Sequence, residues 1–268
     1  MIHKAKKSMG QNFLKSQEAL RKMCEVGEVN GKDTILEIGP GKGALTEKLL
    51  EKAGCVIAVE KDRELLEILK EKFANEIKNK KLILMEDDIL DFEIKNYSLK
   101  KGEYKIIANI PYNITGAIFK KFLSSDIQPE RMVLLIQKEV EERIVASNSK
   151  ESILSLSVKV YGTPKYIMKV HKRFFSPEPK VDSAIISITN ISKENFKTEV
   201  EEKNFFDIIK AGFAHKRKVL RKNLETEQKT LKNIDNIFKK LNINPKARAE
   251  DVKLETWLEI SHNLSTDI

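Results

Sequence analysis

From Thr34 onward the chain alternates short apolar runs with longer amphipathic stretches, and this alternation constrains the fold more than any other feature. The apolar runs are rich in Ile, Leu and Val, as expected of strands that are buried on both faces. Alternation of this kind predicts an α/β fold with a parallel sheet covered by helices on both faces. Predicted strands cover Thr34–Ile38, Cys55–Glu60, 82–85, Tyr104–Asn109 and Arg131–Gln137, and predicted helices cover 44–53, 62–74, Thr115–Leu123 and 138–146.

Two later apolar runs, at residues 165–170 and 184–189, lie close together in the sequence and predict an antiparallel edge to the sheet. Beyond about Asn190 apolar residues recur at helical spacing only, which predicts a second, all-helical domain. The expected domains are therefore 1–190 and 194–268, joined by a polar linker near 191–198. The helical apolar positions are Phe205, Ile208, Ile209, Phe213, Val219, Leu220, Leu224, Ile234, Ile237, Leu241, Leu254, Trp257 and Leu258.

Charge and cysteine content narrow the class of protein. The formal net charge of +9 favours a polyanionic partner, either nucleic acid or an anionic membrane surface. The apolar runs are too short to span a bilayer, and the basic N-terminus lacks the apolar core of a signal peptide. With only two cysteines, Cys24 and Cys55, a disulfide framework is not expected, and we predict a cytoplasmic protein. The histidines and cysteines show no metal-ligand spacing, so no metal is predicted.

A glycine-rich loop, "EIGPGKG" at residues 37–43, follows the first predicted strand and opens a helix. Its glycines allow the backbone to turn tightly and approach a ligand. Glu60 ends the next strand, where a carboxylate can accept hydrogen bonds from both hydroxyls of a ribose. Because Gly39, Gly41 and Ala44 also satisfy the dinucleotide pattern G-x-G-x-x-A, the loop alone does not identify its ligand.

Two acidic positions refine the choice of ligand. Glu37 would place a negative charge beside the pyrophosphate of a dinucleotide, whereas it suits a ligand with an ammonium or sulfonium group. S-adenosylmethionine (SAM) carries both groups. Asp88 follows the strand at 82–85 and is placed to accept a hydrogen bond from an adenine amino group, with Asp87 as an immediate rival.

The stretch "IIANIPYNITG" places Asn109, Pro111 and Tyr112 at the end of the fourth predicted strand, the edge where open parallel sheets bind ligands. An amide oxygen and a backbone carbonyl can accept the two N–H bonds of an exocyclic base amine. This frees the nitrogen lone pair to attack a methyl group. Proline has no competing N–H, and Tyr112 can stack on the base. An amide at this position therefore indicates amine methylation rather than hydrolysis.

Six ordered blocks covering nearly the whole chain resemble the small-subunit (16S) ribosomal RNA adenine N6-dimethyltransferases. The sister family that methylates large-subunit rRNA shares the "NIPY" and Phe-x-Pro-x-Pro elements but resembles the chain less elsewhere. One departure from the small-subunit pattern is Gly116-Ala117, where a bulkier pair is expected. The blocks are "GQNFL" (10–14), "EIGPGKG" (37–43), "NIPYNI" (109–114), "QKEVEERI" (137–144), "FSPEPKVDSA" (175–184) and "FAHKRKVLRKNL" (213–224).

The resemblance implies a Rossmann-like SAM-dependent methyltransferase sheet with a small all-helical C-terminal domain. It also implies dimethylation at N6 of two adjacent adenosines near the 3′ end of 16S rRNA, in the immature small ribosomal subunit, by a monomer. Asn109 and the Pro111 carbonyl would hold the adenine amine, with Tyr112 and Phe175 stacking on its ring. The expected cofactor-binding residues are Gln11, Asn12, Leu14, Glu37, Gly39, Gly41, Glu60, Asp88, Ile89 and Asn109.

Basic residues indicate where RNA phosphates bind. The segment 210–222 holds six basic residues and no acid, and on a helix four of them would share one face. Such contacts position RNA without reading its sequence. Phe175 is expected at the base and its neighbour Phe174 in the core. The predicted RNA-binding residues are Lys4, Lys6 and Lys7 in the N-terminal arm, and Lys216, Arg217, Lys218, Arg221 and Lys222 near the C-terminus.

Other functions remain open on the residues alone. A DNA adenine methyltransferase would use the same chemistry but needs a sequence-reading element. A non-catalytic RNA-binding or assembly factor would share the basic segment. A nicotinamide oxidoreductase would explain the glycine loop but not Asn109–Tyr112.

Overall fold

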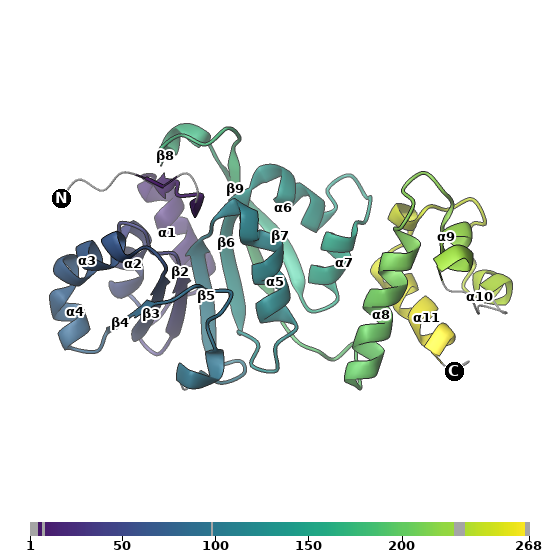
Figure 1. The fold of residues 1–268 in the computed structure, drawn as a ribbon, viewed down its shortest axis with the longest axis horizontal. Coiled ribbons are helices and arrows are strands. Elements are labelled where there is room, and N and C mark those ends of the chain that lie inside the picture. Colours follow the sequence, from purple (N-terminus) through teal and green to yellow (C-terminus); the bar gives the residue numbers. More distant parts are fainter. Residues whose placement is uncertain (1–4, 7–8, 98, 228–233, 266–268) are drawn as a thin grey trace. The chain divides into compact units, whose positions relative to one another are not determined.

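The computed structural model describes residues 5–6, 9–97, 99–227 and 234–265, and the chain divides into two compact units (Figure 1). The first unit comprises Met1–Glu141 and Gly162–Ile191, and the second comprises Glu142–Tyr161 and Ser192–Ile268. The division at residue 191 falls in the expected linker. The segment Glu142–Tyr161, expected in the first domain, instead packs with the helical unit.

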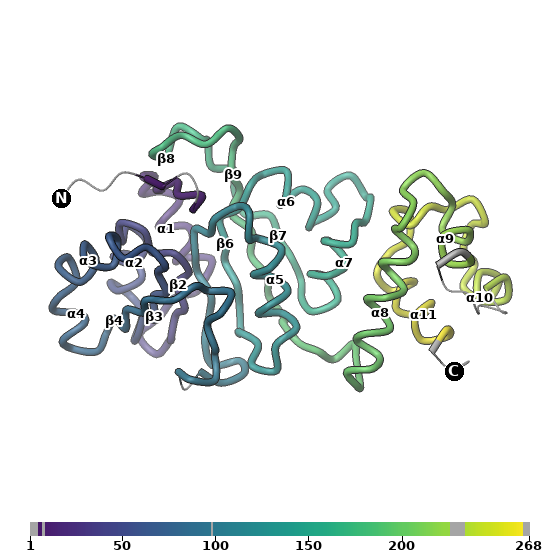
Figure 2. The backbone as a smooth tube through the Cα atoms, in the orientation of Figure 1, coloured from purple at the N-terminus to yellow at the C-terminus, as the bar shows by residue number. Residues whose placement is uncertain are grey.

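The first unit is built on a seven-stranded sheet in the order β4-β3-β2-β5-β6-β9-β7. The five strands from β4 to β6 are parallel, and β9 pairs antiparallel with both β6 and β7. Figure 2 shows β9 lying beside β6, although the two strands are far apart in the sequence. The predicted parallel sheet and antiparallel edge are thus confirmed. The strands are β2 (Thr34–Ile38), β3 (Cys55–Glu60), β4 (Leu82–Glu86), β5 (Tyr104–Asn109), β6 (Arg131–Gln137), β7 (Thr163–Val170) and β9 (Ser183–Thr189).

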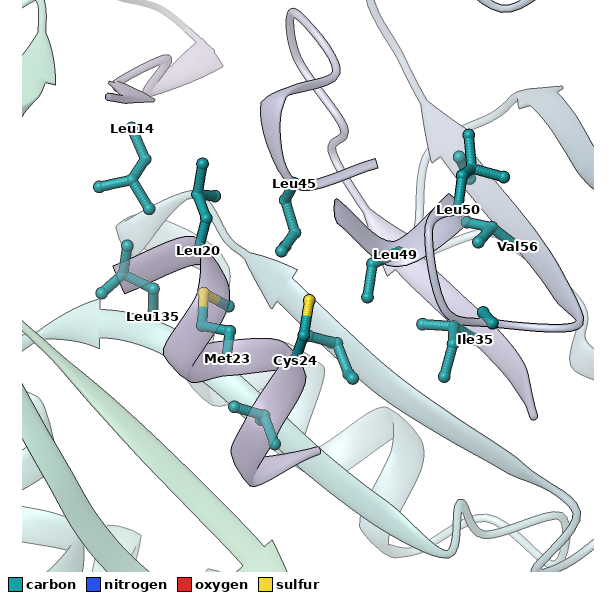
Figure 3. Close-up of a cluster of buried hydrophobic side chains, with 14 of the residues drawn as sticks. Leu14, Leu20, Met23, Cys24, Ile35, Leu45, Leu49, Leu50, Val56 and Leu135 are labelled. Atoms are coloured by element: carbon teal, nitrogen blue, oxygen red, sulfur yellow. The ribbon is translucent and has the colours of Figure 1, made fainter. Parts of the chain in front are cut away.

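Helices cover both faces of this sheet. Ile35 and Ile107 belong to a buried cluster with α1 and α2, which Figure 3 shows in close-up. Their neighbours Leu36 and Ile106 are equally buried and must point to the opposite face, since side chains alternate along a strand. The helices are α1 (Gln17–Val26), α2 (Ala44–Leu50), α3 (Arg63–Lys72), α4 (Ala74–Lys78), α5 (Thr115–Leu123) and α6 (Lys138–Val145), the last of which crosses the division between the units.

The strand order places a topological switch point between β2 and β5. From β2 the chain moves outward through β3 and β4, then returns to β5 on the other side of β2. Helices that follow neighbouring strands in opposite directions leave a crevice at the carboxyl ends of those strands. The glycine loop follows β2 and the Asn109–Tyr112 stretch follows β5, so both open into this crevice.

A small ribbon joins the N-terminal arm to a distant loop. β1 (Phe13–Leu14) pairs antiparallel with β8 (Phe175–Ser176), with Leu14 opposite Phe175. Sequence analysis missed the ribbon and α1, whose first turn is capped by the Ser16 hydroxyl.

The second unit is helical, with α7 (Ile153–Lys159), α8 (Glu199–Gly212), α9 (Leu220–Glu227), α10 (Ile234–Lys240) and α11 (Leu254–Ser265). Trp257 on α11 is fully buried and packs against Gly212, where any side chain would collide with its ring. Among the described residues, no helix has the length and apolar character needed to cross a bilayer.

Candidate active site

A cavity of about 660 Å³ opens at the switch point. Five segments provide most of its lining: the N-terminal arm, the glycine loop, the end of β3 at residues 59–61, the turn at residues 87–89 and the stretch at residues 109–114. Among the expected cofactor-binding and base-holding residues, only Phe175 does not line this cavity. Residues separated by about a hundred positions in the sequence therefore meet at one edge of the sheet.

Glu37 is a buried carboxylate in the cavity wall. It lies on β2 and its side chain is 1% exposed, yet its Oε2 accepts no hydrogen bond from any described residue. Burial raises the pKa of the Glu37 carboxyl to about 8, while Thr46 opposes the rise and the nearby Glu60 adds to it. A buried acid without a partner is costly, and a cation placed beside it would remove that cost.

Glu60, at the end of β3, is held by two backbone donors. The Gly41 N–H donates to its Oε2 at 3.1 Å, and the Asp62 N–H donates to its Oε1 at 2.9 Å. Burial raises the pKa of Glu60, and these two hydrogen bonds oppose the rise. Each carboxylate oxygen retains a lone pair, so Glu60 can still accept from ribose hydroxyls.

The glycine loop passes directly beneath the N-terminal arm. Gly41 has a φ of 60°, and a Cβ there would lie 3.0 Å from the Phe13 ring. At Gly39, which has a φ of 64°, an added Cβ would meet nothing within 4 Å. Gly41 thus allows the close approach of the arm, and Gly39 requires glycine for its backbone conformation alone.

Asn109 is fixed by the N-terminal arm. Its Nδ2 donates to the Asn12 carbonyl at 3.0 Å, and no described residue donates to its Oδ1. The amide therefore keeps its acceptor oxygen free at the end of β5. Pro111 already accepts the Ile114 N–H at 3.3 Å, whereas the carbonyl of Ile110 accepts from no described residue. Ile110 is thus a second candidate, besides the predicted Pro111, for the backbone acceptor of the adenine amine.

The Tyr112 side chain is anchored at its far end. Its hydroxyl lies 2.6 Å from the hydroxyl of Ser183, a buried residue at the start of β9. Burial raises the pKa of Tyr112, and the bond to Ser183 opposes the rise. Ser183 was missed by sequence analysis, although it lies inside the "FSPEPKVDSA" block.

Phe175 is not exposed to the cavity, contrary to expectation. Its side chain is 2% exposed and belongs to the core cluster with Leu14 and Val170. Phe174, expected in the core, is partly buried and packs against the same cluster, with the Arg173 guanidinium 5.1 Å from its ring centre. The β1–β8 register explains the position of Phe175, because it pairs this residue with Leu14.

Asp88 lines the cavity but already has two partners. Its Oδ2 accepts from the Lys61 ammonium at 2.7 Å, and its Oδ1 accepts the Leu90 N–H at 2.9 Å. The bond from Lys61 is the main reason that the pKa of Asp88 is lowered. Its rival Asp87 and its neighbour Ile89 also line the cavity, so the structure brings this whole turn to the site.

The Gly116-Ala117 departure leaves the cavity unchanged. Both residues are exposed near the start of α5, and neither lines the cavity. A Cβ added at Gly116 would meet nothing within 4 Å. A bulkier pair would therefore alter the protein surface beside the site rather than the cavity itself.

Lys6 is engaged in ion pairs rather than freely exposed as an RNA contact. Its ammonium lies 2.7 Å from Asp62 and 3.0 Å from Glu64, and these bonds raise its pKa. Lys4 and Lys7, also predicted to bind RNA, lie outside the described residues. Across the described ranges of the chain, no group of three or more His, Cys, Asp and Glu residues could hold a metal ion.

The basic segment of the second unit is not one helix, contrary to expectation. α8 ends at Gly212 and α9 begins at Leu220, so Lys216, Arg217 and Lys218 lie in an exposed turn between them. The buried side chain of Asn223 stabilises this turn by donating to the carbonyls of Gly212, at 2.5 Å, and His215, at 3.1 Å.

Two basic residues follow this turn on α9. Arg221 is paired with Glu225 at 3.0 Å and Asp235 at 2.8 Å, which weakens its case as a phosphate contact. Lys222 is exposed. The predicted basic face therefore reduces to the exposed turn together with Lys222.

The chain is similar over nearly its full length to known proteins. A family model described as "Ribosomal RNA adenine dimethylase" matches residues 2–266. "Ribosomal RNA small subunit methyltransferase A" of Fusobacterium nucleatum is 38% identical over 262 residues, which is 97% of each chain. The protein of the same name from Dehalococcoides mccartyi is 40% identical over 260 residues, covering 96% of this chain and 87% of that protein.

Solved structures share the fold. A dimethyladenosine transferase from Plasmodium falciparum matches with a TM-score of 0.80 at 24% identity, covering 95% of this chain and 98% of that one. The 23S rRNA methyltransferase ErmE matches with a TM-score of 0.77 at 23% identity, covering 95% and 100%. At these identities the two structures support the Rossmann-like fold and nothing finer.

Proposed function

This chain belongs to the ribosomal RNA adenine dimethylase family, and we propose that it uses SAM to dimethylate N6 of two adjacent adenosines near the 3′ end of 16S rRNA. The observation that carries the proposal is the juxtaposition of Asn109 and Glu37 in one cavity. Asn109 offers an oriented acceptor oxygen, and Glu37 offers a buried carboxylate whose Oε2 has no partner among the described residues. An amine substrate and a cationic cofactor match these two needs.

The cavity residues fit SAM. Glu37 can accept the ammonium group of its methionine part and lies in the field of its sulfonium, while Glu60 can accept from its ribose hydroxyls. Asp88 and Asp87 lie at a third segment of the cavity wall, where an adenine amine can be bound. When bound, SAM supplies an electrophilic methyl group on a positively charged sulfur.

The protein's own contribution to the reaction is to bind and orient the target amine. The Asn109 Oδ1 and a neighbouring carbonyl, from Pro111 or Ile110, accept the two N–H bonds of the adenine N6. This draws the nitrogen toward tetrahedral geometry and localises its lone pair. Tyr112, tethered to Ser183, provides a fixed surface on which the base can stack. Because the nitrogen becomes cationic on methylation, it then loses its proton readily without a strong protein base.

RNA is held in part by the exposed turn of the second unit. Lys216, Arg217 and Lys218 are exposed and form no ion pair with any described acidic residue, and phosphate contacts there would weaken with salt. We also place the reaction in the cytoplasm, on the immature small subunit. We propose that the acting form is a monomer.

The test is transfer of tritiated methyl groups from SAM to small subunits that lack the modification, with the labelled nucleoside identified by mass spectrometry. The expected product is N6,N6-dimethyladenosine. Large subunits and duplex DNA serve as parallel substrates and should remain unlabelled. Labelling of large subunits alone would support the activity of the sister family that methylates large-subunit rRNA. Absence of label with intact RNA binding would support an assembly factor.

A further inference from the structure

Asp62 connects the N-terminal arm to the body of the first unit without itself lining the cavity. Its side chain is 1% exposed and caps α3 by accepting the Glu64 N–H at 3.1 Å. The same carboxylate accepts from two side chains of the arm, the Lys6 ammonium and the Gln11 amide, each at 2.7 Å.

These contacts fix the arm residue that reaches the cavity. Gln11 lines the cavity, and its amide is held at both ends: its Nε2 donates to Asp62, and its Oε1 accepts the Lys6 N–H at 2.7 Å. Hydrogen bonds to a carboxylate are among the stronger ones in proteins. Further along, the arm is tied to Asn109 through Asn12 and to β8 through β1. Asp62 is therefore the tie nearest the N-terminus in the described part of the arm.

Asp62 also acts on the opposite side through its backbone. Its N–H donates to the Glu60 Oε1 at 2.9 Å, while the Gly41 N–H donates to the Glu60 Oε2. One residue thus holds Gln11 with its side chain and Glu60 with its backbone. Both of these residues line the cavity, on different segments.

We propose that Asp62 is a positioning residue that latches the N-terminal arm over the cofactor cavity and thereby sets the affinity for SAM. The inference rests on the proposed function. Each SAM molecule supplies one methyl group, so dimethylation of one adenine requires the cofactor to be exchanged between transfers. The latch controls this exchange, because the arm forms part of the cavity wall.

The variant Asp62→Asn should lose the contacts with the N-terminal arm while it keeps the hydrogen bond that caps α3. Asparagine caps helices as well as aspartate does, so its oxygen can still accept the Glu64 N–H. Its NH₂ group, however, cannot accept from Gln11, and the charge that pairs with Lys6 is lost. We expect amide hydrogen exchange at residues 9–14 to accelerate about tenfold in the cofactor-free protein, and the Kd for SAM to rise by about the same factor. Glu67→Gln is the matched control, since it removes an exposed charge from the same helix, where it pairs only with Lys70.

Lys6→Met distinguishes the latch from general destabilisation. It removes the ion pairs of the Lys6 ammonium with Asp62 and Glu64 but leaves the Gln11 bond and the Asp62 cap of α3 in place, and should raise the Kd for SAM less than Asp62→Asn does. Combined with Asp62→Asn it should add less than its own single effect. Unchanged exchange at residues 9–14 in Asp62→Asn, with the Kd within twofold of wild type, would overturn the latch. Failure of the wild-type protein to bind SAM would instead contradict the proposed function, whereas the exchange measurement would still report on the arm.

Discussion

The polar side chains at the two ends of the parallel strands differ in how completely they are hydrogen-bonded. At the amino end, Lys105 is 3% exposed and donates to Asp33 at 2.9 Å and to the Glu28 carbonyl at 3.1 Å. Arg131 beside it donates to the Val26 carbonyl at 2.6 Å. At the carboxyl end, Glu37 and Asn109 keep oxygens that accept from no described residue. Lys105 and Arg131 therefore support the fold, whereas the oxygens of Glu37 and Asn109 lie in the cavity, where a ligand can complete their hydrogen bonds.

The largest expected effect lies at the amino end. Lys105→Met removes a buried ammonium and leaves the partly buried Asp33 carboxylate without its cation, which should cost about 3 kcal/mol of unfolding free energy, the lower end of the range for a buried pair, because Asn30 still donates to Asp33. Chemical denaturation measures this loss. SAM affinity at a temperature where the variant is folded should match wild type. If Lys105→Met were as stable as the wild type, an unpaired charge would be no more costly at the amino end of the strands than at the carboxyl end.

At the carboxyl end, Asn109→Ala should reduce methyl transfer about 100- to 1000-fold, the range seen when a preorganised polar group is removed from an active site. The stability loss should be small, since a single hydrogen bond to the Asn12 carbonyl is broken. Single-turnover methylation and SAM titration are compared on the same preparation. Turnover within tenfold of wild type would remove Asn109 from the role of amine acceptor.

Because of Glu37, the stability of the folded protein should depend on pH. Its folded-state pKa of about 8 exceeds the ordinary value of 4.5, so the folded protein binds more protons than the unfolded chain between these values. Stability therefore falls as pH rises from about 4.5 to 8. Glu37→Gln should remove this fall and gain roughly 4 kcal/mol at pH 8. Denaturation of both proteins at pH 6 and pH 8 measures the difference.

The same carboxylate predicts that the affinity for SAM changes with pH in the opposite direction to the stability. A cation binds the ionised form of Glu37, so SAM affinity should rise with pH up to about 8 in the wild type. Binding below that pH should release a proton, which calorimetry in buffers of different ionisation enthalpy detects. Glu37→Gln should bind weakly at every pH. If SAM affinity of the wild type were flat from pH 6 to pH 9, Glu37 would not be the residue that meets the cation.

A smaller effect is expected from the anchor of Tyr112. Ser183→Ala removes the partner of the Tyr112 hydroxyl and should raise the KM for RNA about 3- to 10-fold, the value of one net hydrogen bond, with SAM affinity unchanged. Tyr112→Phe should give a similar change, and the double variant little more than either alone. Ser187→Ala, at another buried serine of β9, is the control. Additive effects of Ser183→Ala and Tyr112→Phe would show that the two hydroxyls act independently.

The sequence predicts the sheet well because its evidence is local. Each strand is a continuous apolar run, and the bounds of β2, β3, β5 and β6 match the predicted ones. The ends of these strands then place Glu37, Glu60 and Asn109 at one edge, because parallel strands share a carboxyl end. Most of the candidate site could be located in this way.

What the sequence did not predict depends on partners that are distant along the chain. The full burial of Phe175 is set by the pairing of β8 with β1, two short strands without a periodic signal of their own. Asp62 has a recognisable capping position, but its bond to Gln11 requires the arm to fold back. The charge of Arg221 is likewise neutralised by Asp235 on another helix.

The smallest expected effect compares two arginines of the second unit. Arg217 lies in the exposed turn, whereas Arg221 is paired with Glu225 and Asp235. Arg217→Met should weaken RNA binding about threefold and reduce the salt dependence by about one phosphate contact. Arg221→Met should leave RNA binding nearly unchanged and lower the unfolding free energy by up to about 1 kcal/mol, since its ion pairs are partly exposed. Filter binding at several salt concentrations and denaturation of both variants measure the two quantities. A greater loss of RNA affinity in Arg221→Met than in Arg217→Met would contradict this prediction. It would show that an RNA phosphate displaces the acidic partners of Arg221, so that an ion pair in the free protein does not exclude a residue from RNA binding.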